Sequence, residues 1–350
     1  KEFKHFNSQI IDLDEKLLIS NEKNNFEGEA LRRRQFTFGI SLEDLELILH
    51  PMVEDAKEAT GSMGDDTPLA VLSDKYRPLY HFFRQNFSQV TNPPIDSLRE
   101  NKVMSLKTRF GNLGNILDFD NLTKEDIYVL DSPVLTNSQF KKFKKLFSKK
   151  IRNIDCTFPV ISSLKQRIEE LRDECETAVR EGASALILSD KNISSERASI
   201  PSILAVGAIH SHLVKLGLRG YCSVNVECSD ALDTHSFAVL IGVGATTINP
   251  YLAIDSIYQR FEKKLFGKSD FESCIKKFKK SIDAGLLKIM SKMGISVISS
   301  YRGGCNFEAV GLSRAIVSDY FPGMSSRISG IGIIGIEKKI KELHTKFINK

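Results

Sequence analysis

Polar side chains that follow short apolar stretches are the first candidates for chemistry in this chain. They are Ser189-Asp190, Glu227 with Ser229-Asp230, Asn249-Pro250-Tyr251 and Tyr301-Arg302-Gly303. If the apolar stretches are parallel strands, these side chains lie beyond the carboxyl ends of the strands, where α/β folds place functional groups. Asp190 and Glu227 could then be paired carboxylates for acid–base work. Helix capping and turn closure are the commoner roles for such residues, and Asp230 is well placed to cap a helix.

The histidines and cysteines form no metal-binding pattern. His210 and His212 are two residues apart on one predicted helix, so they face different ways and cannot chelate a metal as an i, i+4 pair does. We expect both, and His235, to be packed and hydrogen-bonded. The cysteines are scattered, with no C-x-x-C pair, so we expect reduced thiols. They are Cys156, Cys175, Cys222, Cys228, Cys274 and Cys305.

Two glycine-bearing segments are candidates for binding phosphate. Residues 242–245, GVGA, follow a predicted helix and precede a predicted strand, the reverse of the order that places phosphate on a helix N-terminus. We therefore expect a helix C-cap there. Residues 301–304 offer Arg302 and open backbone N–H groups. A free-standing barrel enzyme that binds a phosphate-bearing cofactor at 301–304 is thus an alternative, although the absence of a second nearby basic residue or glycine nest favours a structural role.

The elements that would position these groups alternate between strand and helix from Asp155 onward. Such alternation predicts parallel strands joined by right-handed helical crossovers. Predicted strands cover residues 103–106, 127–130, 156–161, 185–190, 222–227, 245–249 and 296–300, with an eighth near 331–336. Predicted helices cover 164–181, 201–216, 231–241 and 254–266, then a helical pair over 270–293. The fold class is α/β: an irregular (β/α)8 barrel with an added N-terminal helical segment, or alternatively an open doubly wound sheet.

A basic, aromatic helix is predicted over residues 140–150, with an N-cap at Thr136 or Asn137. Its composition suits a membrane surface or nucleic acid. However, the spacing of its apolar residues places them on one face, which favours packing against a core with the lysines in water. These residues are Phe140, Phe143, Leu146 and Phe147. Near the N-terminus, Ser41 is a candidate N-cap of a short helix that Pro51 should stop.

The composition further restricts the possible classes of function. The chain has 350 residues, of which 41% are hydrophobic and 27% charged, as in globular proteins with a large core. A net charge of +5 is small for this length and gives no support to nucleic-acid binding. No apolar run approaches the roughly 20 residues that span a bilayer, so we expect neither nucleic acid nor membrane as a partner. The chain begins at Lys1 without a signal peptide, and we expect a piece of a longer protein.

Residues 61–106 contain the stiffest pattern in the chain. A glycine loop at Gly61-Ser62-Met63-Gly64 precedes an aromatic segment and the turn Thr91-Asn92-Pro93-Pro94. Glycine permits backbone angles that other residues resist, and proline fixes φ and restrains the residue before it. The two loops could therefore hold a ligand, the walls of a passage or a domain joint.

Longer motifs show that the chain resembles the central region of the glutamate synthase large subunit. The resemblance covers residues 31–330 and is carried by RRQFTFG (33–39), EDLE (43–46), GSMGDDTPLAVLS (61–73), FSQVTNPPID (87–96), SPVLTN (132–137), IPSILAV (200–206), GVGA (242–245), NPYLA (249–253), GLLKIMSKMGIS (285–296), SYRG (300–303) and FEAVGL (307–312).

The resemblance implies a parent enzyme that makes L-glutamate from L-glutamine and 2-oxoglutarate, using FMN and an iron–sulfur cluster. It implies that this segment, without catalytic residues, cofactor or metal of its own, connects the glutamine amidotransferase and FMN-binding domains and helps to form an ammonia tunnel. Met63 and Thr91 should line the tunnel, with Ser62, Gly64 and Asn92 as neighbours. The electron donor would be a partner subunit or ferredoxin, in a bacterial cytoplasm or a plastid stroma.

The resemblance also suggests a division of the chain. Residues 1–60 would be a helical lead-in, 61–330 the barrel-like domain, and 331–350 a linker towards the FMN domain. The sequence departs from the family pattern at Cys305, Ser211 and Ser236. No family role is carried over to those three positions.

Overall fold

A four-stranded parallel sheet forms the centre of the fold. In the computed structural model, which describes residues 10–20, 22–61, 66–87, 99–114, 127–304 and 306–348, its strands run in the order β10-β9-β7-β5. They are β5 (Ile151–Asp155), β7 (Ala185–Ser189), β9 (Ser223–Glu227) and β10 (Thr247–Asn249). The side chains of β7 from Ala185 to Leu188 are buried on both faces, which is why this strand is apolar without alternation. The prediction of an α/β fold with a parallel sheet is confirmed.

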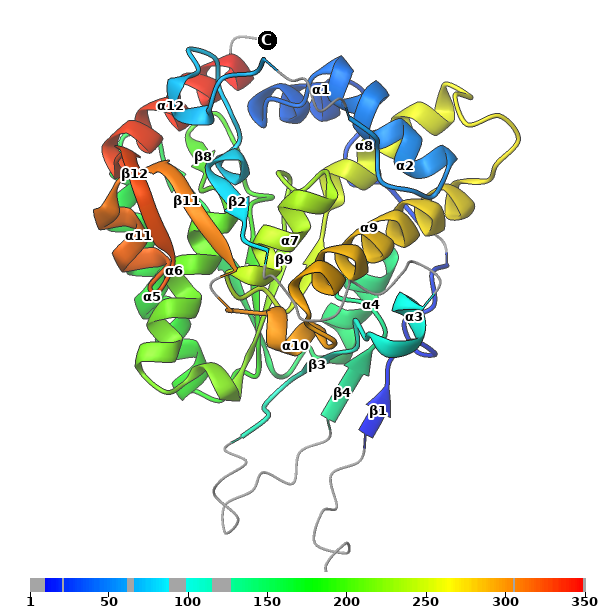
Figure 1. Cartoon of the computed structure of the whole chain (residues 1–350), viewed down its shortest axis with the longest axis horizontal. Helices are drawn as coiled ribbons and strands as arrows, with labels where there is room; N and C mark the ends of the chain where they lie inside the picture. Colours follow the sequence, from blue (N-terminus) through cyan, green and yellow to red (C-terminus); the bar gives the residue numbers. More distant parts are fainter. Residues whose placement is uncertain are drawn as a thin grey trace, which may run out of the picture.

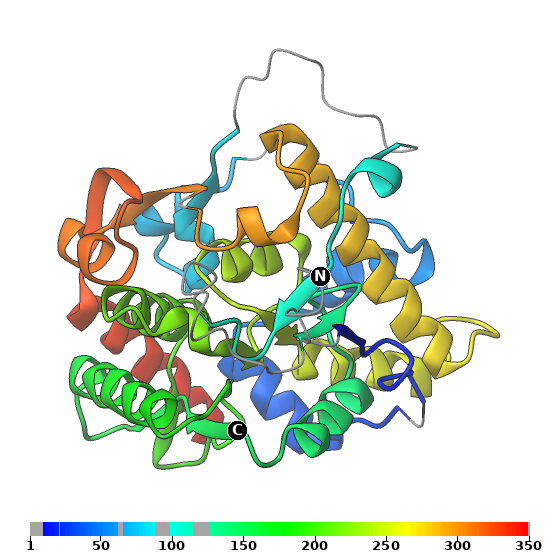
Figure 2. The ribbon, with the colours of Figure 1, turned by 90° about the horizontal axis from the view of Figure 1, so that it is seen from below.

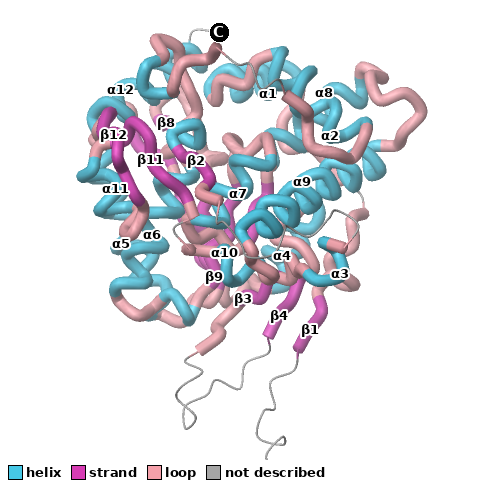
Figure 3. The backbone as a smooth tube through the Cα atoms, viewed as in Figure 1, coloured by secondary structure: helices cyan, strands magenta, loops and turns pink. Residues whose placement is uncertain are grey.

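Three smaller sheets surround this one, and together the described strands do not close into a barrel. Their orders are β1-β4-β3, β12-β11-β2 and β6-β8. The strands are β1 (Ile10–Asp12), β2 (Phe83–Gln85), β3 (Thr108–Phe110), β4 (Ile127–Leu130), β6 (Thr157–Pro159), β8 (Arg197–Ser199), β11 (Phe307–Leu312) and β12 (Ser325–Ile331). Three pairs, β3 with β4, β11 with β2 and β6 with β8, are antiparallel. Figure 3 shows β11 and β12 at the left edge of the molecule and β1, β3 and β4 at its lower end.

The helices lie around the sheets. The longer ones are α1 (Gly28–Thr37), α4 (Asn137–Leu146), α5 (Leu164–Arg180), α6 (Ser202–Lys215), α7 (Thr234–Gly242), α8 (Tyr251–Glu262), α9 (Phe271–Met293) and α12 (Ile333–Ile348). The shorter ones are α2 (His50–Glu54), α3 (Glu100–Val103), α10 (Ile298–Tyr301), α11 (Arg314–Tyr320) and the turns η2 (Asp44–Leu49), η3 (Ala70–Leu72), η4 (Leu79–Phe82) and η5 (Arg219–Tyr221). Figures 1 and 2 place α11 and α12 on one side of the molecule and α8 and α9 on the other.

Three of the predicted strands are wrong. Residues 296–300 enter helix α10. Residues 103–106 begin with the last residue of α3, Val103, and make only the bridge between Ser105 and Val297. The eighth strand, predicted near 331–336, is also wrong, because β12 ends at Ile331 and helix α12 begins at Ile333. The predicted stretch 156–161 does contain a strand, β6, but β6 pairs with β8, and the strand that joins the parallel sheet is β5, just before it. Each of these stretches is short, and an apolar run of about four to six residues does not distinguish a strand from one turn of helix.

Two helix predictions also change in detail. Ser41 does cap the first turn, since its Oγ accepts from Asp44 N at 3.1 Å, but Pro51 does not stop the helix. A π-helical turn, η2, precedes the proline, which sits in the first turn of α2, where its missing N–H costs little. The predicted helical pair over 270–293 is one helix, α9, capped by Asp270.

The basic helix packs largely as predicted. Thr136 forms a capping box with Gln139 at the start of α4. Phe140, Phe143 and Phe147 are buried in a cluster with β3 and β4. Leu146 is 47% exposed, so its predicted inward position is wrong; in a helix of 3.6 residues per turn it lies at the edge of the apolar stripe.

Residues 333–348 form helix α12. Helix α12 buries Ile336 and Leu343, and Glu337 accepts a hydrogen bond from Leu164 N at 2.9 Å, at the start of α5. The division of the chain at residues 60 and 330 stays a prediction. Within the described residues, no helix combines the length and apolar character needed to cross a membrane.

Candidate functional site

The carboxyl ends of β7, β9 and β10 gather polar side chains, as the sequence predicted. The register pairs Ser189 with Glu227, and Glu227 with Asn249. Asp190 follows β7 directly, and Asp190 N donates to the carbonyl oxygen of Glu227 at 3.3 Å. The side chains of Asp190, Glu227 and Asn249 are nevertheless almost completely buried, so each must be satisfied from within the protein.

Asp190 is held by Ser229, which follows β9. Its Oδ2 accepts from Ser229 N at 2.9 Å and its Oδ1 from Ser229 Oγ at 3.1 Å. Ser229 Oγ is also hydrogen-bonded to the hydroxyl of Tyr251, at the start of α8. Burial, together with the nearby charge of Asp230, raises the pKa of Asp190 to about 7. The hydrogen bonds among Asp190, Ser229 and Tyr251 thus link the ends of β7 and β9 to the start of α8.

Asp230 does not cap α7, contrary to prediction. The cap is Asp233, whose Oδ1 accepts from Ser236 N at 2.9 Å. The carboxylate of Asp230 instead accepts from Tyr80 OH at 2.9 Å and from Ser202 N, at the start of α6, at 3.0 Å. Burial raises its pKa. Asp230 thus fixes η4 and α6 to the sheet.

Glu227 is engaged by different partners from Asp190. Its carboxylate forms ion pairs of 2.8 Å with Lys144 of α4 and with Lys191 beyond β7, and it accepts from Ser189 Oγ at 2.8 Å. Burial alone would raise the pKa of Glu227, but the charges of Lys191 and Lys144 lower it. The pKa of Asp190 is therefore raised and that of Glu227 is lowered, and each carboxylate has its own partners. This arrangement fits a structural role better than a shared acid–base role.

Asp190→Asn is expected to change how stability depends on pH. The folded pKa of about 7 lies above the ordinary 3.8, so between these values the folded state keeps a proton that the unfolded chain has lost. Stability from this group is present at low pH and falls by about 1.4 kcal/mol per pH unit as pH rises towards 7. The free energy of unfolding is measured with urea at pH 5, 6 and 7. From pH 5 to pH 7 it should fall by about 2 to 3 kcal/mol more for the wild type than for the variant. Parallel profiles would contradict the raised pKa.

Tyr301-Arg302-Gly303 lies at the opposite end of the sheet, so its predicted place at the carboxyl edge is wrong. Arg302 Nε donates to the carbonyl oxygen of Ala245 at 3.1 Å, just before β10 begins. Burial, with the charge of Arg219, lowers the pKa of Arg302 to about 9. The reason for the displacement is that residues 296–300 do not form a sheet strand that would deliver the segment to the carboxyl edge.

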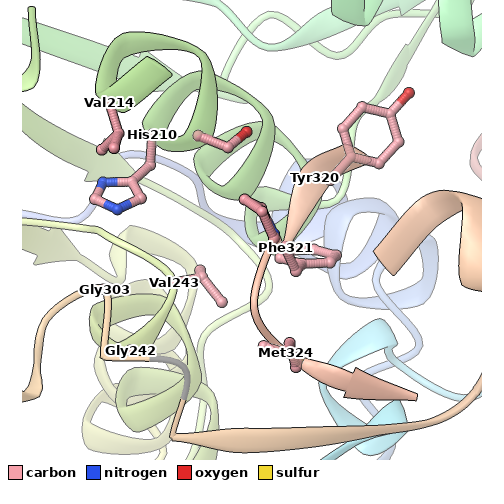
Figure 4. Close-up of a pocket in the computed structure, with 10 residues that line it drawn as sticks. His210, Val214, Gly242, Val243, Gly303, Tyr320, Phe321 and Met324 are labelled. Atoms are coloured by element: carbon pink, nitrogen blue, oxygen red, sulfur yellow. The ribbon is translucent and has the colours of Figure 1, made fainter. Parts of the chain in front are cut away.

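A cavity of about 150 Å³ lies near this end, between α6, α7 and α11 (Figure 4). Its walls include His210, Ser211, Val243, Tyr320 and Phe321. His210 Nδ1 accepts from Arg219 Nε at 3.1 Å, and burial with the charges of Arg219 and Arg302 lowers the pKa of His210 to about 3. Burial raises the pKa of Tyr320 to about 12. Both lining groups are therefore neutral near pH 7.

His212 and His235 do not line this cavity and have partners elsewhere. His212 Nε2 is 3.0 Å from Glu176 Oε2, and His235 Nε2 is 3.0 Å from the carbonyl oxygen of Tyr80. The expectation that they are packed and hydrogen-bonded is confirmed. In the described part of the chain, no three His, Cys, Asp or Glu side chains are placed to hold a metal ion. The five described cysteines are buried and unpaired with one another.

The tunnel residues named from the sequence lie outside the described residues. They are Ser62, Met63, Gly64, Thr91 and Asn92. Cys305 also lies outside, whereas Ser211 lines the cavity and Ser236 belongs to the capping box of α7. The sequence did not predict the pairing of Lys144 and Lys191 with Glu227. The two lysines come from segments far apart in sequence, and Lys144 was assigned only to the solvent-exposed face of its helix.

Comparison with known proteins gives the family. The model of the glutamate synthase central domain matches residues 33–313. The chain is 58% identical over 335 residues to the glutamate synthase [NADPH] large chain of Azospirillum brasilense, covering 95% of this chain and 22% of that one. It is 40% identical to the glutamate synthase [NADPH] large chain of Bacillus subtilis (93% and 21%) and 40% identical to the ferredoxin-dependent glutamate synthase of Pyropia yezoensis (95% and 22%).

The chain spans about a fifth of the length of these curated relatives. Among solved structures, the flavin-binding domain of baker's yeast flavocytochrome b2 matches with a TM-score of 0.41 and 10% identity, over 84% of this chain and 96% of that one. That likeness is too distant to indicate a function. The family model and the sequence relatives agree: this chain belongs to the glutamate synthase central domain family.

Proposed function

We propose that the chain is the connecting domain of a glutamate synthase that makes L-glutamate from L-glutamine and 2-oxoglutarate. The observation that carries this proposal is the family match over residues 33–313, within relatives about five times as long as the chain. The domain itself does no chemistry in this proposal. In support, the carboxylates at the carboxyl edge of the sheet are buried and bound to internal partners.

The rest of the parent enzyme would supply the reaction. A glutamine amidotransferase domain and an FMN-binding domain of the same chain would flank this one, and an iron–sulfur cluster would carry electrons to the flavin. The donor would be a partner subunit or ferredoxin; relatives named for NADPH, NADH and ferredoxin all match this chain. The parent would work in a bacterial cytoplasm or, as the chloroplastic relative of Spinacia oleracea suggests, a plastid stroma.

The four sheets would be arcs of an irregular (β/α)8 barrel. Single parallel bridges support this arrangement, one between Val134 and Ile248 beside β10 and one between Ser105 and Val297. The phosphate-cofactor alternative is not favoured, because Arg302 bonds to a backbone carbonyl at the amino end of the sheet.

The second part of the proposal is that the glycine loop and the Thr-Asn-Pro-Pro turn form the wall of an ammonia passage. Ammonia must be kept from bulk water, where it would become protonated and leave, so a passage needs stiff walls with few charges. Met63 is apolar and adaptable enough to act as a gate, and Thr91 offers a hydroxyl that can donate or accept a hydrogen bond. Ser62, Gly64 and Asn92 would lie beside them.

Met63→Trp in the full-length enzyme is expected to uncouple glutamine hydrolysis from glutamate formation. A bulky ring would obstruct the passage, so ammonia would escape. Hydrolysis of each glutamine would still release one glutamate, but the glutamate formed from 2-oxoglutarate per glutamine hydrolysed would fall well below one. The glutamine hydrolysed and the glutamate formed from 2-oxoglutarate are measured in the same assay. The matched control is Leu72→Trp, nine residues along the same segment, whose side chain is 70% exposed and should tolerate the ring in solvent. Equal rates of hydrolysis and synthesis in Met63→Trp would refute the tunnel assignment.

A further inference from the structure

A polar cleft of about 820 Å³ opens beside α4 and the carboxyl ends of β9 and β10. We call it the lysine cleft, because six of its lining side chains are lysines. They are Lys23, Lys141, Lys142, Lys144, Lys145 and Lys191. It is separate from the cavity of Figure 4, which lies towards the amino ends of the strands.

The charges in this cleft are strongly unbalanced. Glu227 is the only acidic residue among its described lining residues, against six lysines. The whole chain, by contrast, has 49 basic and 44 acidic residues. Like charges gathered in a concave surface repel one another, and they raise the local concentration of anions from solution.

Two of the ammonium groups are held in place at the floor. Lys144 Nζ and Lys191 Nζ each lie 2.8 Å from a different oxygen of Glu227, which is 4% exposed. Lys191 Nζ also donates to Asn25 Oδ1 at 2.8 Å. The lysine side chains remain 33% and 26% exposed, so they still face the cleft. Asp255, which accepts from Asn25 and Asn137, is a second carboxylate near Lys191. The surplus of positive charge therefore comes from the rim lysines. The two ammoniums at the floor are already oriented, which lowers the ordering cost of binding an anion.

Neighbouring aromatic rings and amides further restrict these lysines. Lys144 Nζ lies 4.8 Å from the ring centroid of Phe140, and Lys191 Nζ lies 4.8 Å from that of Tyr251. Asn249, 1% exposed, donates to Asn137 Oδ1 at 3.1 Å and so ties the end of β10 to the start of α4. Open α/β sheets bind ligands outside the carboxyl ends of their strands, which is where this cleft lies.

We propose that the lysine cleft binds a small anion that carries two or more carboxylate or phosphate groups. One anionic group would contact Lys144 and Lys191, and a second would be neutralised by lysines at the rim, such as Lys141 and Lys145. The proposal rests on the charge and geometry of this cleft and does not depend on the ammonia passage.

The test measures protection of individual lysines from acetylation in the full-length protein. Citrate and pyrophosphate are the two probes, used without divalent cations and at constant ionic strength, with modification read by peptide mass spectrometry. We expect the probe to slow acetylation of Lys144 and Lys191 in a saturable way and to leave Lys149 unaffected, since that exposed lysine does not line the cleft. Tighter binding of citrate would assign the site to polycarboxylates, and tighter binding of pyrophosphate to phosphate compounds.

Three variants make the expectation specific. Lys191→Gln should raise the probe concentration needed for half-protection of Lys144 by about tenfold or more, because one charge-assisted hydrogen bond is lost. Glu227→Gln should lower the probe concentration needed for half-protection, because both ammoniums are freed from their carboxylate. Lys149→Gln should leave that concentration unchanged. Circular dichroism checks that each variant is folded. No saturable protection with either probe, or an equal effect of Lys191→Gln and Lys149→Gln, would overturn the proposal.

Discussion

Phe143→Ala is expected to lower the free energy of unfolding by about 3 to 5 kcal/mol, the usual cost of truncating a buried phenylalanine. Phe143 is 0% exposed, and its ring centroid lies 5.3 Å from that of Phe110 on β3 and 4.8 Å from that of Phe147. The substitution would open a cavity where α4 meets the β1-β4-β3 sheet. Because these rings are the core of that sheet, the residues around them cannot collapse to fill it.

Urea unfolding followed by circular dichroism measures this loss. Leu146→Ala is the matched control on the same helix, since Leu146 is 47% exposed and its truncation should cost about 1 kcal/mol or less. Similar losses for the two variants would contradict the view that the aromatic face of α4 is a packing surface. A large loss for Phe143 alone would support it.

The parts of the fold that could be predicted are those with a strong local signal. The four apolar residues 185–188 and the amphipathic stretch 164–180 specify β7 and α5 without knowledge of the rest of the chain. Strands β1 and β2 have three residues each and pair with partners 117 or more residues away. A period of two cannot be recognised in three residues. These two smaller sheets, and the division of the described strands among four sheets, could therefore not be predicted from the sequence.

The same limit applies to the candidate site. Asp190, Glu227 and Asn249 could be placed at one edge because each directly follows or ends a predicted strand. The ion pairs of Glu227 could not be predicted, because Lys144 lies 83 residues before it and Lys191 lies 36 residues before it. Arg302 was misplaced because its position depended on a strand that is a helical turn, α10.

The end of α7 depends on a glycine for two separate reasons. Gly244 has φ of +126°, and a Cβ built there would lie 2.3 Å from His210 Cγ. His210 cannot easily move away, since Arg219 Nε donates to its Nδ1 at 3.1 Å and Arg219 Nη2 donates to the Gly244 carbonyl oxygen at 2.9 Å. The imidazole, the guanidinium and the glycine backbone therefore form one closely packed unit, in which the prediction of a helix C-cap at 242–245 is confirmed.

Gly244→Ala is expected to lower the free energy of unfolding by about 3 kcal/mol or more, from backbone strain of about 1 to 2 kcal/mol plus the clash with His210. Gly182→Ala is the control, because Gly182 has φ of +95° but no heavy atom within 4 Å of a built Cβ; it should show the strain alone. His210→Ala in the Gly244→Ala background removes the ring but keeps the His210 Cβ, which lies 2.7 Å from the built Cβ. It should therefore recover part of the difference between the two single variants, as a double-mutant cycle measures. If Gly244→Ala and Gly182→Ala cost the same, or His210→Ala recovers nothing, then backbone conformation alone requires the glycine and His210 packing does not.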